Sequence, residues 1–307
     1  MLNLGMAADK IRSGSVVYEI LNNHLESPGK LFRPKLTVQL GKLLKLGEEN
    51  CRDICWASEL IHNASLIHDD VVDNAFIRRD RPTLNSFMPN SKAVLAGDYL
   101  LASVIAELVR LEKYEILKTL AETLEEIVAG EFEQDELKLK AHVNWEDLES
   151  VALKKTGALI AWNCHSVAVT TGLSLESQEI CKQLGFKLGL AFQLVDDNLD
   201  YSLTSGKEYA KDLKEGLINF TTLNLIQSYP ELYYAIYQLR GTKFDNPPWT
   251  ENQIEDAKLK TFEKVNELFE ETYHLLFVLA EKENISHSSD EYKSVLQFLE
   301  GVQGRVR

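Results

Sequence analysis

The chain has 307 residues, of which 45% are apolar and 26% charged, the composition of a soluble globular protein. Its formal net charge of −14 argues against nucleic acid or an anionic membrane surface as the main partner. No apolar run is long enough to span a bilayer, no signal-peptide pattern opens the sequence, and the four cysteines include no CxxC pair, so we expect a reduced, cytoplasmic protein.

Apolar residues recur at three- and four-residue spacing along most of the chain, which predicts helices rather than strands. The segments with this spacing are residues 93–111, 114–139, 148–170, 176–201 and 255–280. We expect Asn144 and Thr250 each to begin a helix, because each is a capping residue followed by an acidic first turn. No linker or low-complexity stretch divides the chain, so we expect one all-α domain over residues 1–307.

A short acidic pattern occurs twice, as DDVVD at residues 69–73 and as DDNLD at residues 196–200. On a helix the first and last Asp of each copy, four residues apart, lie on one face. Carboxylates held that close repel each other unless a cation lies between them. Mg²⁺ suits such a site, because it takes oxygen ligands from one or two carboxylates and completes its shell with substrate phosphate. Two clusters that faced each other would therefore hold a diphosphate from both sides.

Basic residues gather near the first acidic pattern and near a Gly-Pro turn, in a chain that is otherwise acidic. Lys30 and Arg33 lie three residues apart in the segment GKLFRP, and Arg78, Arg79 and Arg81 follow the first Asp pattern. Arg binds phosphate oxygens through two N–H groups and Lys binds them through a point charge, so these residues are candidate phosphate ligands. The alternative is a solvated, charged face without a ligand.

His62 lies seven residues before Asp69, on nearly the same stripe of the predicted helix as Ser58 and Ser65. A lone helical His is most often a core or surface residue with an ordinary partner. The acidic pattern and the serines on the same face favour a phosphate or substrate contact instead.

Glu59-x-x-His62 and Glu271-x-x-His274 indicate an alternative metal site, because they are spaced like the ligand pairs of di-iron helix bundles. Such a site needs one more Glu from each of two further helices, and it would leave both Asp patterns without a role. The sequence therefore favours magnesium over iron.

Several segments, taken together and in order, resemble the trans-prenyltransferase (polyprenyl diphosphate synthase) family. They are GKLFRP at 29–34, ELIHNASLIHDDVVD at 59–73, Arg78-Arg79, Pro82-Thr83, LAGDYLL at 95–101, GEFEQ at 130–134, KTGAL at 155–159 and GLAFQLVDDNLDY at 189–201. The match covers residues 29–222, whereas residues 223–307 resemble the family only in being helical. The resemblance implies a single-domain, isoprenoid-synthase-type helical bundle around a central apolar cavity.

By this resemblance the protein joins isopentenyl diphosphate head to tail to an allylic diphosphate, with Mg²⁺ as cofactor. The implied metal ligands are Asp69, Asp73, Asp196 and Asp200, supported by Asp70 and Asp197, and they hold three Mg²⁺ ions once diphosphate is bound. The implied ligands of isopentenyl diphosphate are Lys30, Arg33, His62 and Arg79. Those of the allylic diphosphate are Arg78, Lys155, Thr156, Gln193 and Lys207. The implied catalytic residues are Asp69, Asp73, Lys155 and Gln193.

Small residues before the first Asp pattern bear on product length. The growing tail should run back along the helix from Asp69 past Ser65 and Ala64, where short-chain members of the family usually place aromatic residues. Each open helical turn of ~5.4 Å admits roughly one isoprene unit. We therefore expect an all-trans product longer than farnesyl diphosphate, as for a quinone side chain. The alternative is that Ala64 and Ser65 only pack against a neighbouring helix.

The chain departs from the family's usual pattern at six positions. They are Asp80 for Gly, Asn198 for an apolar residue, Ala210 for Gly, Leu217 for Lys, Asn219 for Thr and Thr221 for Pro. These changes would alter the allylic preference, weaken the activity or make it depend on a partner subunit.

The resemblance implies a homodimer, with a heteromeric partner as the alternative. Two other functions stay open at this point. A class I terpene cyclase shares the Asp pattern but needs no isopentenyl diphosphate site. A non-catalytic subunit of a heteromeric synthase would be an interaction protein, although such chains typically lose the Asp patterns that are intact here.

Overall fold

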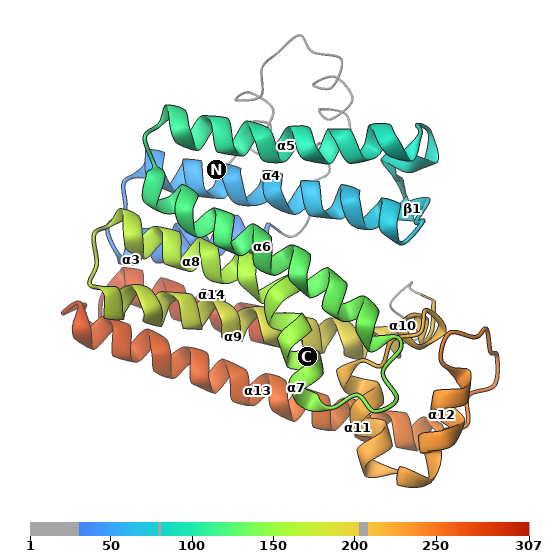
Figure 1. Ribbon diagram of the computed structural model, residues 1–307. Coiled ribbons are helices and arrows are strands. Elements are labelled where there is room, and N and C mark those ends of the chain that lie inside the picture. Colours follow the sequence, from blue (N-terminus) through green and yellow to red (C-terminus); the bar gives the residue numbers. More distant parts are fainter. Residues whose placement is uncertain (1–30, 79–80, 203–207, 307) are drawn as a thin grey trace. The chain divides into compact units, whose positions relative to one another are not determined.

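The computed structural model of the chain describes residues 31–78, 81–202 and 208–306 (Figure 1). Helices make up nearly all of the regular structure in these residues, so the all-α prediction is confirmed. None of these helices is both long and apolar enough to cross a membrane. The described residues form two compact units. One contains those up to Leu120 together with Ser166–Leu173, and the other contains Ala121–His165 and those from Ser174 onward. The single domain over residues 1–307 stays a prediction.

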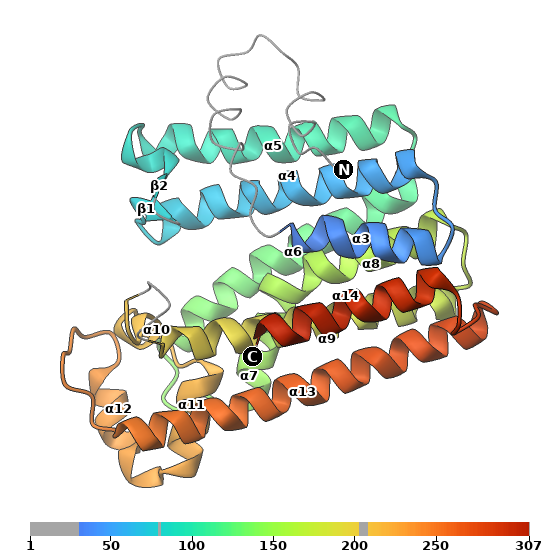
Figure 2. The same cartoon turned by 180° about the vertical axis from the view of Figure 1, so that it is seen from behind.

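The first unit is built on two long helices, α4 (Glu48–Val72) and α5 (Asn90–Arg110), which lie side by side in both views (Figures 1 and 2). Its other elements are α3 (Phe32–Leu43), the strands β1 (Ile77–Arg78) and β2 (Arg81–Pro82), the 3-10 turn η1 (Leu84–Ser86), the first part of α6 (Tyr114–Leu137) and the last part of α8 (Ala158–Thr170). The two strands pair antiparallel and form a short hairpin directly after α4.

A glycine lets α5 approach α4 closely. An added Cβ on Gly97 of α5 would lie 2.3 Å from Nε2 of His68 on α4. The same Nε2 atom lies 3.3 Å from Oδ1 of Asp98 and 3.2 Å from the Val94 carbonyl, so α5 holds this edge of the imidazole ring. Ala64 lies one turn before His68 on the same stripe of α4 and is fully buried. In the C-terminal half of α4, the helix face that carries Ala64 and His68 therefore faces α5. Asp69 lies on the adjacent face of the helix.

The second unit contains the remaining helices, with α9 lying along α13 in both views (Figures 1 and 2). Its elements are the rest of α6 and α8, α7 (Trp145–Ala152), the π-helical turn η2 (Leu153–Gly157), α9 (Leu175–Asp200), α10 (Lys211–Lys214), α11 (Phe220–Ser228), η3 (Pro230–Leu232), α12 (Tyr233–Leu239), α13 (Glu251–Lys282) and α14 (Asp290–Val306).

Both predicted helix starts are confirmed as capping boxes. Asp147 N–H donates to Asn144 Oδ1 and Asn144 N–H donates to Asp147 Oδ2, each at 2.9 Å. At the start of α13, Thr250 N–H donates to Gln253 Oε1 at 2.8 Å and Gln253 N–H donates to Thr250 Oγ1 at 3.4 Å. The helix predicted over residues 148–170 is interrupted by the π-helical turn at 153–157, which apolar spacing does not reveal.

Two glycines bring the backbone of α9 against η2 and α8. An added Cβ on Gly185 would lie 2.4 Å from Cα of Ala161, and an added Cβ on Gly189 would lie 2.4 Å from Cα of Gly157. Because the neighbouring atoms are backbone, neither side can move away cheaply. Only glycine therefore fits at these positions, and the close approach places the π-helical turn beside the C-terminal half of α9.

We expect Gly189→Ala to lower the free energy of unfolding by about 1–3 kcal/mol, because the new methyl group overlaps the backbone of Gly157. Gly301→Ala in α14 is the matched control, since nothing lies within 4 Å of its added Cβ, and this change should stabilise the helix by about 0.5–1 kcal/mol. Denaturant unfolding of the two variants measures both effects. A Gly189→Ala variant as stable as the wild type would contradict this account of the packing.

Candidate active site

The three Asp residues of the first pattern have different surroundings. α4 ends at Val72, and Asp73 caps it by donating its backbone N–H to the Asp69 carbonyl at 2.8 Å. Asp73 is exposed and Asp69 is half-buried, whereas Asp70 is only 2% exposed. The first and last carboxylates are therefore the accessible ones, one helical turn apart as predicted.

Asp70 holds the segment that follows α4. Its Oδ1 accepts a hydrogen bond from Nε of Arg78 at 2.6 Å, and its backbone carbonyl accepts one from Nδ2 of Asn85 at 3.0 Å. Thr83 adds a third tie by donating its hydroxyl to the Ala75 carbonyl at 2.7 Å. These contacts fold the β1–β2 hairpin back on the end of α4. As a result the Arg78 guanidinium, 36% exposed, lies beside the acidic cluster.

Arg33 joins the same helix from α3. Its Nε lies 3.2 Å from Oε1 of Glu59, which is three residues before His62 on α4. The carboxylate of Glu59 is nearly buried, so it keeps the guanidinium in place. Arg33 and His62 are both predicted ligands of isopentenyl diphosphate. The ion pair therefore fixes Arg33 of α3 to a residue one helical turn before His62, within one unit. Lys30 and Arg79, predicted for the same substrate, lie outside the described residues.

The di-iron alternative finds no support in these contacts. The carboxylate of Glu59 pairs with Arg33, and that of Glu271 pairs with Lys187 at 2.5 Å. Within the part of the chain that the structure describes, no three or more His, Cys, Asp or Glu side chains form a group that could hold a metal on their own.

The π-helical turn η2 presents Lys155, and α6 holds its ammonium group. Lys155 Nζ forms an ion pair with Glu131 and lies 3.1 Å from Oε1 of Gln134. An added Cβ on Gly130 would lie 2.7 Å from Cβ of Lys154, so the glycine makes room for the turn. The GEFEQ segment, to which the sequence assigned no role, thus positions Lys155. In the sequence, the feature that could have indicated this role is a Glu and a Gln three residues apart, which lie on one face of a helix.

A chain of hydrogen bonds connects η2 to the second Asp pattern. Thr156 Oγ1 donates to Oε1 of Gln193 at 2.8 Å, and Nε2 of Gln193 donates to Oδ1 of Asp197 at 2.9 Å. The structure therefore brings together Lys155, Thr156 and Gln193. Lys207, the fourth predicted allylic ligand of this unit, lies outside the described residues.

In the second pattern Asp196 is exposed, whereas Asp197 and Asp200 are 3% and 4% exposed. Asp197 accepts the Phe220 N–H at 2.9 Å. Burial and then the nearby charge of Asp212 raise the pKa of the Asp197 carboxyl well above its usual range. Asp200 accepts backbone N–H groups of Lys211 at 3.0 Å and of Asp212 at 3.3 Å. Its role as a metal ligand stays a prediction.

The accessible donors suit Mg²⁺ better than a softer metal. Asp69 and Asp73 in the first unit, and Asp196 in the second, each offer carboxylate oxygens, the type of ligand that Mg²⁺ prefers. Mg²⁺ takes one or two protein carboxylates and fills the rest of its octahedral shell with water and phosphate oxygens.

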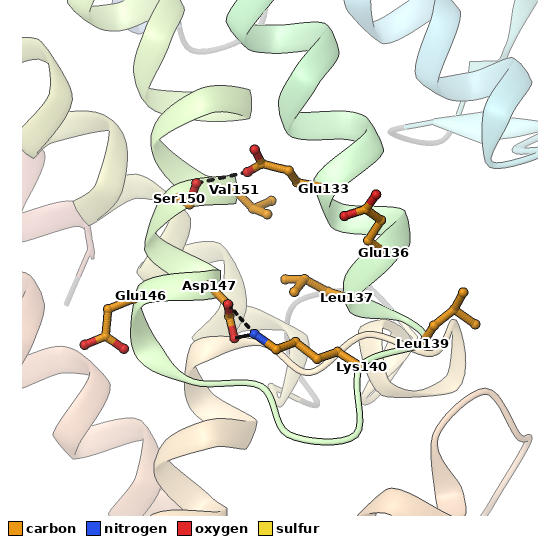
Figure 3. A pocket seen from close by; sticks show the side chains of 9 residues that line it. All are labelled: Glu133, Glu136, Leu137, Leu139, Lys140, Glu146, Asp147, Ser150 and Val151. Atoms are coloured by element: carbon orange, nitrogen blue, oxygen red, sulfur yellow. Dashed lines mark hydrogen bonds and ion pairs between the residues drawn. The ribbon is translucent and has the colours of Figure 1, made fainter.

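A pocket of about 710 Å³ lies between the end of α6 and the start of α7 (Figure 3). Glu133 accepts the Ser150 hydroxyl there at 2.9 Å, and Lys140 Nζ lies 2.6 Å from both carboxylate oxygens of Asp147. Its lining is rich in carboxylates and includes none of the predicted site residues. It is therefore not the apolar cavity that the sequence predicts, and that cavity stays a prediction.

Known proteins resemble this chain in sequence. A family model described as polyprenyl synthetase matches residues 15–251. The all trans-polyprenyl-diphosphate synthase of Mus musculus is 35% identical over 219 residues, which are 68% of this chain and 54% of the mouse protein. The mitochondrial solanesyl-diphosphate synthase 1 of Oryza sativa subsp. japonica is 34% identical over 260 residues, 83% of this chain and 58% of the rice protein. The chain thus spans little more than half the length of these relatives.

The fold also matches a solved structure. The decaprenyl diphosphate synthase from Rhodobacter capsulatus superimposes with a TM-score of 0.79, over 98% of this chain and 94% of that chain, at 24% identity. At that identity the likeness shows a shared fold alone. The family model, however, matches well over half of the sequence and includes both Asp patterns. The chain therefore belongs to the polyprenyl synthetase family.

Proposed function

We propose that the chain is a Mg²⁺-dependent trans-prenyltransferase that joins isopentenyl diphosphate head to tail to an allylic diphosphate. One observation carries the proposal. At the end of α4, Asp69 and Asp73 are accessible. Between them in the sequence, the buried Asp70 accepts a hydrogen bond from Nε of Arg78 at 2.6 Å and so keeps this guanidinium at the same end of the helix. Carboxylates that suit a metal and a guanidinium that suits phosphate therefore lie next to each other.

The first chemical step would be loss of diphosphate from the allylic substrate. In this proposal Asp69, Asp73 and Asp196 bind the metal, and Arg78 binds phosphate oxygens. When bound, Mg²⁺ neutralises the charge that develops on the leaving group. The C–O bond breaks with its electron pair on the diphosphate, and Lys155 adds a further positive charge next to the leaving oxygens. Thr156, next to Lys155 in the chain, and Gln193, to which its hydroxyl donates at 2.8 Å, would bind the allylic diphosphate beside it.

The second step forms the new carbon–carbon bond. Arg33 and His62, with Lys30 and Arg79 from outside the described residues, hold the diphosphate of isopentenyl diphosphate. Its double bond attacks the allylic carbon, and a proton then passes to the released diphosphate. Water must be kept away, because it would trap the cation. Loss of this proton from the added unit forms a new double bond beside its diphosphate-bearing carbon, so the product is again an allylic diphosphate and the reaction can repeat.

Other parts of the proposal rest on the family rather than on contacts in this chain. They are three Mg²⁺ ions with bound diphosphate, a homodimer, a single catalytic domain and a cytoplasmic location. The names of the mouse and rice relatives, polyprenyl- and solanesyl-diphosphate synthase, support a product longer than farnesyl diphosphate. The rice relative is named as mitochondrial.

We expect the purified chain to elongate allylic primers when given Mg²⁺, isopentenyl diphosphate and geranyl, farnesyl or geranylgeranyl diphosphate. Elongation should stop when the metal is chelated. Chromatography of the products identifies the function: linear polyprenyl diphosphates support the proposal, and cyclic hydrocarbons would indicate a terpene cyclase. A chain that is inert alone but active with a second subunit would be a partner-dependent component.

Asp69→Asn should lower kcat at least about 100-fold, because a metal-binding oxygen is lost where charge develops. Thermal unfolding should change little, since Asn keeps the size and shape of the Asp side chain in the last turn of α4. Asp135→Asn is the matched control: this carboxylate is exposed, pairs with Lys138 at 2.7 Å, and its loss should not affect kcat. Initial rates at saturating substrates measure the effect. Equal rates for the Asp69 variant and the wild type would remove Asp69 from the mechanism.

The two small residues before Asp69 face different surroundings, which bears on product length. Ser65 lies one turn before Asp69 on the same stripe, is half-buried, and donates its hydroxyl to the His62 carbonyl at 2.9 Å. Ala64 is fully buried and shares its stripe with His68, which α5 holds. We infer that Ser65 is the residue that limits the tail, and that Ala64 packs between helices.

Ser65→Phe should therefore shorten the product by one or more isoprene units, because the ring blocks the Asp69 face of α4. Ala64→Phe should instead destabilise the protein by about 1–3 kcal/mol through overpacking against α5. Product analysis and denaturant unfolding separate the two effects. An unchanged product distribution for Ser65→Phe would place the tail elsewhere.

A further inference from the structure

Asn198, inside the second Asp pattern, bridges two other helices. Its Nδ2 donates to the carbonyl of Lys258 on α13 at 3.1 Å, and its Oδ1 accepts the hydroxyl of Thr221 on α11 at 2.6 Å. Both Asn198 and Thr221 are positions at which the sequence departs from the pattern it resembles. Their contact shows that the two departures form one interaction.

The contact belongs to a larger polar network, two of whose members are fully buried. Thr221 Oγ1 lies 3.4 Å from Oγ1 of Thr261, which accepts a hydrogen bond from Nδ2 of Asn224 at 2.8 Å and donates one to the Ala257 carbonyl at 3.0 Å. Thr221 and Thr261 are both fully buried. Removal of one member would leave a buried polar atom without its partner, which costs more than the bond itself contributes.

A second hydrogen bond between α9 and α11 lies next to this network. Asp197 accepts the N–H of Phe220 at 2.9 Å, one residue before the contact between Asn198 and Thr221. Consecutive residues of α9 are therefore fastened to consecutive residues at the start of α11. Asp196 directly precedes them on the last turn of α9 and is the exposed carboxylate of this pattern.

We propose that Asn198 and Thr221 act as one positioning pair, which fixes the last turn of α9 so that Asp196 is held ready to bind Mg²⁺ with diphosphate. Neither residue touches the metal in this proposal. Each acts through the orientation of the turn, as groups behind metal ligands commonly do. The inference rests on the proposed function, because it assumes that Asp196 binds metal.

A double-mutant cycle tests the pairing itself. Asn198→Leu and Thr221→Val remove the amide and the hydroxyl while keeping the side-chain shape, and each should lower the melting temperature by about 2–4 °C. The double variant should lose clearly less than the sum of the two, because neither polar group is then left without its partner. Additive losses would overturn the pairing. If Asn198→Leu does not fold, Asn198→Ala takes its place in the cycle.

The positioning role needs a readout that stability alone does not change. Calorimetric titration with inorganic diphosphate at a fixed Mg²⁺ concentration should show a dissociation constant about tenfold higher for each single variant. Thr221→Ser keeps the hydroxyl and should bind like the wild type. Ser228→Ala is the matched control at the other end of α11, where the hydroxyl binds Lys260 at 2.7 Å, and it should leave diphosphate binding unchanged.

The possible results distinguish the inference from the proposed function. Single variants that melt lower but bind diphosphate within twofold of the wild type would overturn the positioning role. A wild-type chain that binds diphosphate and elongates primers while its variants behave normally would overturn only this inference. A wild-type chain that binds no diphosphate with Mg²⁺ would overturn the proposed function and this inference together.

Discussion

The rest of the site depends on one constraint: a buried carboxylate must accept hydrogen bonds. In each Asp pattern the second residue is buried and takes a donor from a later segment. Asp70 accepts Nε of Arg78, and Asp197 accepts the backbone N–H of Phe220. Each buried Asp thereby fixes the segment that follows its helix, and the first Asp of the pattern remains accessible. The two copies, far apart in the sequence, share this division of roles.

Close backbone approach is the second requirement, and glycine meets it. Gly189 lets α9 lie against Gly157 at the end of the π-helical turn, and Gly130 makes room for the same turn beside α6. Larger side chains would push Lys155 and Thr156 away from Gln134 and Gln193, with which they form hydrogen bonds. Gly130 and Gly189 thus allow Lys155 and Thr156 to reach their hydrogen-bond partners.

Three of the residues that depart from the family pattern, Asn198, Asn219 and Thr221, form hydrogen bonds at the junction of α9 and α11. Asn219 accepts the N–H of Thr222 at 2.9 Å and so caps α11, while Thr221 binds Asn198 in the last turn of α9. A segment that looks altered residue by residue is therefore connected by its own hydrogen bonds. These substitutions therefore change the hydrogen bonds that connect the second Asp pattern to α11, and they leave its Asp residues in place.

The sequence alone determined what depends on near neighbours: the helices, the capping boxes at Asn144 and Thr250, and the one-turn spacing of each Asp pattern. Only the tertiary structure decided which Asp is buried, that Glu131 and Gln134 hold Lys155, and that Asn198 meets Thr221. The physical reason is that burial and hydrogen-bond partners arise between segments distant in the chain, whereas helical periodicity and capping arise within a few residues.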